Sequence, residues 1–460
     1  MKPSNSLPDG PNMPKLLRRF KFVFQPIKYV EDFAKVYGDT FAIRGFYNDT
    51  AVIYISHPEA LEQLFTTNPN NLRSASRILR FLLGDRSIIL LDGEEHRRQR
   101  QLLAPPFHGE RMRAYGETIR DVVEQVSNQW EMGKPFKIRG SMQEIALQVI
   151  LRVVFGLDEG KRSQKLAKLL NSVLESIGSP LLSAGLFFSF LQKEFGGLSP
   201  WGQMKRKLQQ IDELIYELIQ ERRVESDRDR QDILSLMMSA RDEDGQPMSD
   251  QDLHDELMTL LIAGHETTAS ALSWAFYWID YLPDVQGKLL KELAEQGDNL
   301  DPNIISKLPY LTAVCQETLR IHPIVMSGVL RFVTSPIEIM GYKLPVGTGI
   351  IPSIYMAHHR EEVYPEPKKF KPERFLERQF SPYEFLPFGG GNRRCIGMAF
   401  ALYEMKIAIA TILSNYVVSR RDSRPVAPVR RGFTSAAPAG MKMIATPVSK
   451  SAKNLNYKMI

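Results

Sequence analysis

Residues 388–397, FGGGNRRCIG, place a cysteine after a run of glycines and in front of an apolar stretch of helical character. At the start of a helix, the positive end of the helix dipole and the free backbone N–H groups stabilise the thiolate form of Cys395. A soft anionic sulfur backed by amide donors suits iron ligation, and the glycines let the backbone approach a flat ligand closely. The alternatives are a phosphate-binding loop and a cysteine nucleophile. The first lacks the glycine patterns of both common phosphate-binding loops, and the second lacks a histidine base close in sequence.

The peptide AGHETT puts polar side chains into the middle of an otherwise apolar helix. Burying Glu266 and Thr267 is costly unless they are hydrogen-bonded or used in chemistry. The small residues Ala263 and Gly264 make a groove where a small ligand could approach the backbone. A zinc-protease motif is excluded because Ala269 stands where the second histidine ligand belongs. The remaining alternative is a helix kink whose hydroxyl groups cap backbone carbonyls.

Two further sets of polar residues lie at helical spacing. Glu317 and Arg320 stand three positions apart and share a helix face, and Arg374 in a later PERF segment could complete a buried network with them. Such pairs occur on many surface helices and carry little information alone. His96 and Arg100 stand four positions apart, point the same way from one helix, and could together hold carboxylate groups.

These residues need a scaffold, and the hydrophobic periodicity predicts a mainly α protein with small β-sheets at its edges. We expect one domain over residues 1–460, with a flexible polar N-terminus at residues 1–12 and a C-terminal tail at residues 450–460. The apolar segment 181–191 is either core packing or a mobile cap over an apolar entrance. Expected helices cover most of residues 94–223, then 250–282, 309–321 and 396–416, and expected strands cover residues 41–46, 51–56, 337–339, 342–344 and 348–353.

Composition narrows the class of protein. Of the 460 residues, 43% are hydrophobic and 24% are charged, which excludes disordered and fibrous chains. Two cysteines exclude a disulfide-stapled scaffold and favour a reducing compartment. The net charge of +6 comes without the concentrated basic stripe of a nucleic-acid-binding protein. The polar N-terminus is neither a signal peptide nor an anchor, and polar side chains interrupt residues 257–282, so we expect a cytoplasmic protein without a transmembrane anchor.

In chain order, these segments resemble the motifs of the cytochrome P450 superfamily of haem-thiolate monooxygenases. The motifs are A-G-x-E-T-T, E-x-x-R, P-E-R-F and F-x-x-G-x-R-x-C-x-G, and their separations here are similar to those of the family. The resemblance extends from Tyr37 to Thr434 and is strongest to soluble cyanobacterial members of the microsomal-like branch. It implies the cytochrome P450 fold, in which a large helical domain encloses haem beside a small β-rich N-terminal region.

The resemblance also implies a role for each matched residue. Cys395 corresponds to the thiolate ligand of the haem iron, and Glu266 and Thr267 correspond to the acid–alcohol pair that manages protons. His96 stands where many relatives carry tryptophan and can still donate a hydrogen bond to the cofactor. The implied structural network comprises Glu317, Arg320 and Arg374, and the implied cofactor-binding residues are His96, Arg100, Ala263, Gly264, Arg331, Phe388, Arg393 and Gly397.

By this resemblance, the protein is expected to insert one oxygen atom of O2 into a C–H bond of a lipophilic substrate. We expect a long-chain fatty acid, with Arg77 and Arg80 as candidate contacts for its carboxylate unless both lie on the surface. A terpenoid such as a sesquiterpene is the alternative substrate. The alternatives of other classes are a non-catalytic haem-thiolate sensor or carrier and a hydroperoxide isomerase or peroxygenase, and the intact acid–alcohol pair disfavours them. The expected pocket positions are Ile78, Leu82, Leu260, Ile324, Val325, Met326, Val329, Phe433 and Thr434.

The resemblance implies haem b as the cofactor, with electrons from NAD(P)H delivered by separate redox partners. A ferredoxin with its reductase is expected, or a flavodoxin in its place. An acidic ferredoxin would suit a basic face of Arg393, Arg394, Lys368 and Lys369, whose alternative role is plain surface charge. We expect a monomer that binds O2 and a small lipophilic molecule, without a nucleic-acid partner and with a peripheral membrane contact left open.

Overall fold

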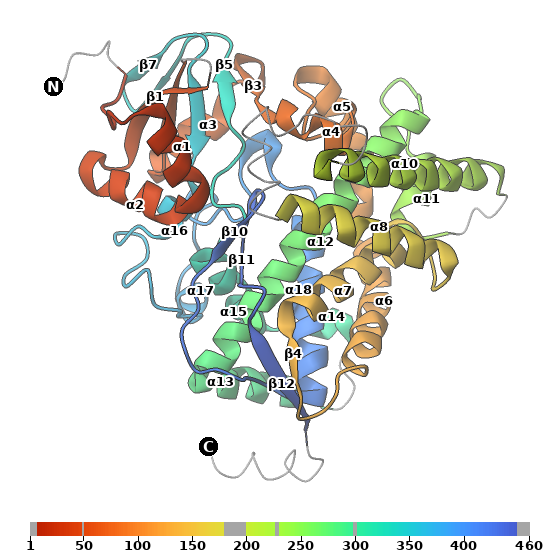
Figure 1. The fold of residues 1–460 in the computed structure, drawn as a ribbon. Helices are drawn as coiled ribbons and strands as arrows, with labels where there is room; N and C mark the ends of the chain where they lie inside the picture. Colours follow the sequence, from red (N-terminus) through yellow and green to blue (C-terminus); the bar gives the residue numbers. More distant parts are fainter. Residues whose placement is uncertain (1–6, 48–49, 179–198, 226–229, 298–300, 449–460) are drawn as a thin grey trace.

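The computed structural model describes residues 7–47, 50–178, 199–225, 230–297 and 301–448. Within these ranges the chain is mainly helical with small sheets, as the sequence predicts. The largest sheet lies with the N-terminal helices at one end of the molecule, and helices form most of the remainder (Figure 1). The expected cap segment 181–191 lies outside the described residues.

The central element is α12 (Asp250–Tyr281), which runs through the middle of the molecule (Figure 1). It begins with a capping box, in which Ser249 and Asp252 each bond the other's backbone N–H, and it stops just before Pro283. Three other helices pack against its buried length: α7 (Ile138–Val149), α15 (Pro309–Ile321) and α18 (Met398–Asn415).

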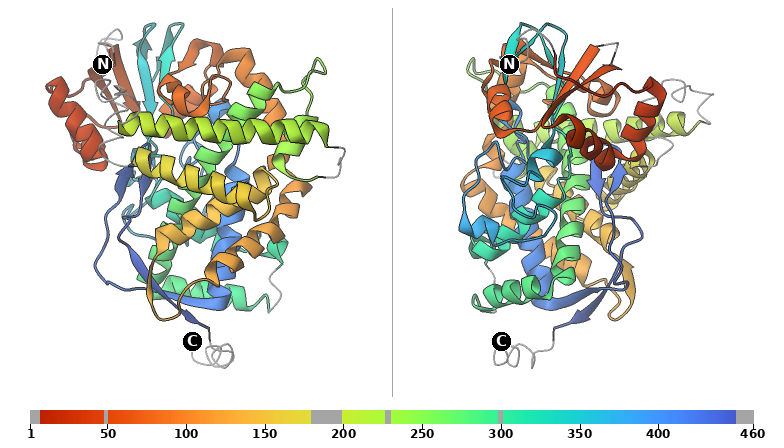
Figure 2. Two further views of the ribbon diagram at one scale, coloured as in Figure 1. Left: turned by 45° about the vertical axis from the view of Figure 1, so that its right-hand side comes forward. Right: turned by 90° about the vertical axis from the view of Figure 1, so that its left-hand side faces the viewer.

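A second group of helices covers one side of α12. The helices α8 (Lys161–Gly178) and α10 (Pro200–Val224) pack side by side, and α10 crosses the N-terminal end of α12 (Figure 2). A π-helical stretch, Ile150–Val154, follows α7 without a break and also packs on α12. In the described part of the chain, no helix combines the length and the apolar character that crossing a bilayer requires.

The largest sheet has five strands in the order β1-β2-β8-β5-β3. β1 (Thr40–Tyr47) and β2 (Thr50–Ile55) form the predicted hairpin, with Phe41 opposite Tyr54. β2 pairs in parallel with β8 (Gly349–Pro352), and the remaining neighbours are antiparallel. The sheet therefore brings β5 (Arg331–Val333), which carries Arg331, next to β3 (Leu72–Ser74).

The predicted helix at residues 396–416 is shorter than expected, because Gly397 caps it and Tyr416 begins a strand. Two N-terminal helices and several short elements were not anticipated from the sequence. The remaining helices are α1 (Lys15–Phe24), α2 (Pro26–Tyr37), α3 (Pro58–Thr66), α4 (Arg80–Leu83), α5 (Gly93–Leu103), α6 (Glu110–Ser127), α11 (Ile233–Ser239), α13 (Pro283–Ala294), α14 (Pro302–Ile305), α16 (Ile354–His358) and α17 (Arg374–Glu377). The remaining strands are β4 (Pro135–Lys137), β6 (Ile337–Ile339), β7 (Tyr342–Leu344), β9 (Tyr416–Arg420), β10 (Val429–Arg431), β11 (Thr434–Ala436) and β12 (Lys442–Pro447).

Candidate functional site

The glycine-rich loop folds back on itself in front of α18. The backbone N–H of Cys395 donates to the carbonyl of Phe388 at 2.9 Å, which closes the loop. Gly389 and Gly391 have φ of +71° and +65°, a region that glycine adopts without strain. A Cβ atom at Gly390 would fall 2.6 Å from the ring of Phe65, so the loop lies directly against α3. Glycine is required here for both conformation and close packing.

The thiol of Cys395 is accessible and lies directly before the first turn of α18. Desolvation by the surrounding protein raises the pKa of this thiol, while a hydrogen bond from the Gly397 backbone N–H and the positive charge of Arg100 act in the opposite direction. The other cysteine, Cys315, is fully buried in the core, and burial raises its pKa to about 12. Cys395 is therefore the cysteine that can bind a metal, and its surroundings include the donors that stabilise a thiolate.

Four basic side chains gather near the cysteine loop: His96 and Arg100 from α5, Arg331 from β5 and Arg393 from the loop itself. Burial and the charges of the three arginines lower the pKa of His96 to about 3. Burial also lowers the pKa of Arg331 to about 10, with Arg393 as the next contribution. Asp92 is the one carboxylate paired with this cluster among the described residues, through Arg393. The cluster therefore carries uncompensated positive charge.

This donor set fits haem. The cofactor has two carboxylate groups, which match basic side chains in excess of their counter-ions. The Nε atom of Arg331 is buried and has no hydrogen-bond partner in the described chain, as expected for a donor that serves a ligand. A thiolate at Cys395 would supply a sulfur ligand to haem iron. The residues present can therefore hold the group that the resemblance implies.

The AGHETT segment lies in α12 as predicted. Ala263 is exposed although it is in the middle of this buried helix, and Gly264 packs closely, since a Cβ there would fall 3.1 Å from Ile150. The Thr267 hydroxyl donates to the Ala263 carbonyl at 2.5 Å, which is the capping interaction considered as the alternative. Glu266 instead faces other elements and accepts hydrogen bonds from outside α12.

The partners of Glu266 are residues that the sequence did not indicate. Arg139 of α7 donates to one carboxylate oxygen, and Gln143 of the same helix donates to the other at 2.9 Å. Arg431 of β10 forms an ion pair with this carboxylate at 3.6 Å. These contacts join residues more than 120 positions apart in the chain, a distance at which sequence spacing carries no signal.

Glu317, Arg320 and Arg374 come together in the buried interior. Arg320 binds both oxygens of Glu317, at 2.6 and 2.8 Å, and Arg374 donates to the same carboxylate at 3.2 Å. The guanidinium of Arg320 also donates to the backbone carbonyls of His358 and Pro367. The network therefore holds residues 358–374, which precede the cysteine loop, against α15. These hydrogen bonds do not involve the Cys395 thiol.

The expected pocket positions divide into two groups. Leu82 and Ile324 are buried in the core, whereas Val325, Val329 and Phe433 are apolar side chains that stay exposed. The side chain of Ile78 lies outside the described part of the structure. The others, Leu260, Met326 and Thr434, are partly buried.

The expected basic face is smaller than predicted. Arg393 turns inward to Asp92, so it belongs to the buried cluster and not to the surface. Lys368 pairs with Glu31, and Lys369 also has an acidic partner. Arg394 remains exposed beside Cys395.

Arg80 is likewise engaged, because its guanidinium binds Asp85 on the protein surface. The side chain of Arg77 is outside the described part of the structure. The guanidinium of Arg80 is therefore already paired with a carboxylate at the surface.

Comparisons with known proteins identify the family of the chain. A family model described as Cytochrome P450 matches residues 8–441. A chain named cytochrome P450 135A1, from Mycobacterium tuberculosis, is 33% identical over 454 residues, which cover 96% of each chain. Cytochrome P450 135B1 of the same organism is 34% identical over 421 residues, or 90% of this chain and 86% of its own. The solved structure of retinoic acid-bound cyanobacterial CYP120A1 has a TM-score of 0.83 and 24% identity, and the match covers 96% of this chain and 100% of that one.

Proposed function

The chain belongs to the cytochrome P450 family of haem-thiolate monooxygenases, and from this premise we propose that it oxidises a C–H bond of a long-chain fatty acid or a comparable lipophile. The observation that carries the proposal is the accessible Cys395 thiol in front of α18, beside a cluster of basic side chains in excess of their counter-ions. Exposed apolar side chains at Val325, Val329 and Phe433 support a lipophilic substrate.

In this proposal Cys395 binds the iron of haem b, and His96, Arg100, Arg331 and Arg393 bind its carboxylates. When bound, the cofactor supplies the activation of O2. The loop glycines let the backbone lie against a flat ligand, and by the family resemblance Phe388 would pack against that ligand near the sulfur. Haem retention therefore depends on the loop geometry as well as on the thiolate.

The chain's own acid–alcohol pair supplies protons. The Thr267 hydroxyl hydrogen is directed to the Ala263 carbonyl, so its oxygen is free to accept a hydrogen bond at the reacting face. Both oxygens of Glu266 are engaged, by Arg139 and by Gln143, so this carboxylate can take up a proton only when one contact opens. We propose that Glu266 links Thr267 to solvent in this way. A sensor or carrier has no need of this pair, so that alternative is not favoured.

A terpenoid remains the second candidate substrate. The same exposed apolar side chains would suit an isoprenoid skeleton, and the retinoic acid bound to the cyanobacterial structure is a carboxylated isoprenoid. Retinoic acid therefore belongs in the panel of ligands. For electron supply we propose separate partners that draw on NAD(P)H, with an acidic ferredoxin docking at the face that exposes Arg394.

The decisive experiment is the absorption spectrum of the reduced protein under carbon monoxide. We expect the red-shifted Soret band of thiolate-ligated haem in the wild type and its loss in Cys395→Ser. Cys315→Ala is the matched control, and it should keep the band because Cys315 lies in the core. A wild-type protein that is colourless, or that shows the band of a neutral ligand when freshly prepared, would overturn the proposal.

Ligand titrations of the same holoenzyme then test the substrate class. A shift of the ferric haem from low spin to high spin with hexadecanoic acid, and not with a sesquiterpene, is the expected result. The reverse preference would favour the terpenoid alternative, and no shift with any lipophile would contradict both.

A further inference from the structure

Two arginines from different elements converge on Glu266 of α12. Arg139 of α7 donates to the carboxylate, and Gln143 of the same helix satisfies its second oxygen at 2.9 Å. Arg431, at the end of β10, approaches the same carboxylate with its Nε atom at 3.6 Å. One negative charge thus faces two positive charges.

Arg139 requires Glu266 as its counter-ion. Its side chain is 3% exposed, and its Nε and Nη1 atoms are buried without a hydrogen-bond partner. A buried guanidinium without a counter-ion is strongly unfavourable, and Glu266 is its only ion-pair partner among the described residues. Because Glu266 is committed to Arg139 and Gln143, it can neutralise Arg431 only weakly.

Of the two arginines beside Glu266, Arg431 is therefore the one whose charge is less well neutralised. Its guanidinium donates no hydrogen bond to any residue that the structure describes, and 3.6 Å exceeds hydrogen-bond length. Its side chain keeps 19% of its surface exposed. The end of α8 leaves room for it, since a Cβ atom at Gly178 would fall 2.5 Å from Arg431 Nη2.

The hairpin that carries Arg431 also presents apolar side chains to solvent. Arg431 ends one strand of the β10–β11 hairpin, and the turn of this hairpin carries Phe433, whose ring is 41% exposed. The next strand packs against α12, the helix that carries Glu266 and Thr267. The backbone N–H of Ser435 donates to the Ile324 carbonyl at 2.7 Å, which fixes the hairpin beside the exposed Val325. A guanidinium without a hydrogen bond to the described residues, on a hairpin that also carries exposed apolar side chains, suits a ligand with one anionic end and a long apolar body.

We propose that Arg431 binds the carboxylate of an apolar monocarboxylic acid, because among the described residues the Arg139–Glu266 pair leaves it only a long ion pair with Glu266. This inference rests on the proposed oxidation of a lipophile and specifies the class of substrate. It also replaces Arg80, which binds Asp85 at the surface, as the arginine that recognises the acid. Arg431 is a specificity-determining residue in this scheme.

The test is a titration of the ferric holoenzyme with two ligands of equal length, hexadecanoic acid and hexadecan-1-ol, in detergent-free buffer below their aggregation limits. Binding is followed by the spin-state shift and, independently, by calorimetry. We expect the acid to bind more tightly than the alcohol. Losing a charge-assisted hydrogen bond in Arg431→Gln should weaken acid binding by about ten- to hundredfold and leave alcohol binding within about twofold.

Two variants accompany Arg431→Gln. Arg431→Lys keeps the charge and should recover part of the affinity for the acid. Arg424→Gln is the matched control, because Arg424 is 85% exposed in a surface ion pair and should bind both ligands as the wild type does. If Arg431→Gln fails to retain haem, the salt dependence of the wild type decides: affinity for the acid should fall with ionic strength, and affinity for the alcohol should not.

The outcomes separate this inference from the proposal on which it rests. Equal binding of acid and alcohol by the wild type, or an Arg431→Gln variant that still prefers the acid, would overturn the role of Arg431 while leaving lipophile oxidation intact. Failure of the wild type to bind any lipophile would contradict the proposed function itself.

Discussion

Gly390 shows how one missing side chain holds the cysteine loop in place. Its φ of −152° is extended backbone that any residue can adopt, so conformation alone does not require glycine. A Cβ atom there would nevertheless lie 2.6 Å from two ring carbons of Phe65. We expect Gly390→Ala to destabilise the holoprotein by about 1–3 kcal/mol through overpacking, measured as a lower midpoint of urea unfolding.

A double-mutant cycle isolates this contact. Phe65→Ala should remove the clash, so the double variant should be more stable than the sum of the two single changes predicts. Gly140→Ala in α7 is the matched control, because a Cβ at Gly140 meets no atom within 4 Å and the helix favours alanine. Additive effects of Gly390→Ala and Phe65→Ala would show that the loop does not depend on this packing.

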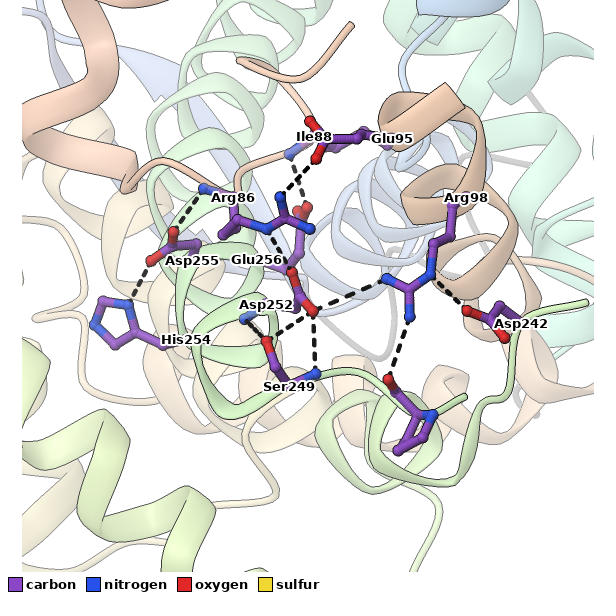
Figure 3. A network of polar contacts seen from close by, with 11 residues as sticks. Arg86, Ile88, Glu95, Arg98, Asp242, Ser249, Asp252, His254, Asp255 and Glu256 are labelled. Atoms are coloured by element: carbon purple, nitrogen blue, oxygen red, sulfur yellow. Dashed lines mark hydrogen bonds and ion pairs between the residues drawn. The ribbon is translucent and has the colours of Figure 1, made fainter. Parts of the chain in front are cut away.

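At the scale of elements, the first turns of α12 hold the segment that leads into α5 (Figure 3). Asp255 accepts the backbone N–H of Arg86 at 2.7 Å, and Glu256 accepts that of Ile88 at the same distance. Asp252 binds the Arg86 side chain at 2.9 Å. Three carboxylates on one helix thereby position the segment from which α5 presents its basic residues to the cysteine loop.

His254 connects this network to α10 and makes it sensitive to pH. Its ring lies between Asp255 at 2.8 Å and Asp212 of α10 at 3.1 Å, and it stacks on Tyr216. Burial lowers the pKa of His254, but the hydrogen bonds to the two carboxylates outweigh it and raise the pKa to about 9. A pKa above the unfolded value near 6.5 means that this stabilisation is complete below about pH 6.5 and is lost as pH rises towards about 9.

We therefore predict that His254→Gln lowers the free energy of unfolding by an amount on the order of 2 kcal/mol at pH 6 and by little at pH 9.5. The measurement is the urea midpoint of the holoprotein across this range. His108→Gln, at an exposed position, provides the matched control. Burial raises the pKa of Glu256 to about 8, so the free energy of unfolding of every variant also falls with rising pH for this reason. The quantity to compare is therefore the difference in the free energy of unfolding between wild type and His254→Gln at each pH. Parallel pH curves for the two proteins would exclude the proposed role of His254.

Over the whole molecule, the sequence predicts local structure but does not predict contacts between residues far apart in the chain. The long helices and the β1–β2 hairpin follow from hydrophobic periodicity, and the cysteine loop follows from residue types within ten positions. The ion pairs of Glu266 with Arg139 and Arg431 could not be predicted, because the chain brings these residues together only through the packing of α7 and the β10–β11 hairpin on α12. The inward turn of Arg393 has the same origin, since Asp92 is 301 positions away.

The distribution of surface charge predicts where an acidic electron donor would dock. With Arg393 turned inward and Lys368 paired with Glu31, Arg394 is the exposed basic residue next to the thiolate. A rim charge of this kind contributes mainly to the association rate and its salt dependence. We predict that reduction of the holoenzyme by an acidic ferredoxin slows as ionic strength rises, and that Arg394→Gln lowers the second-order rate constant by about two- to fivefold at low salt.

The matched control is Lys134→Gln, which removes the same charge from the turn between α6 and β4 and should leave the rate constant unchanged. The carbon monoxide spectrum of each variant shows whether haem ligation is intact, so a slower rate cannot be attributed to loss of the cofactor. Equal rates for Arg394→Gln and the wild type, with the salt dependence retained, would mean that a basic patch elsewhere receives the ferredoxin. Arg394→Gln and Lys134→Gln have the same net charge. A difference between their rate constants therefore reports the position of the removed charge, and the total charge does not explain it.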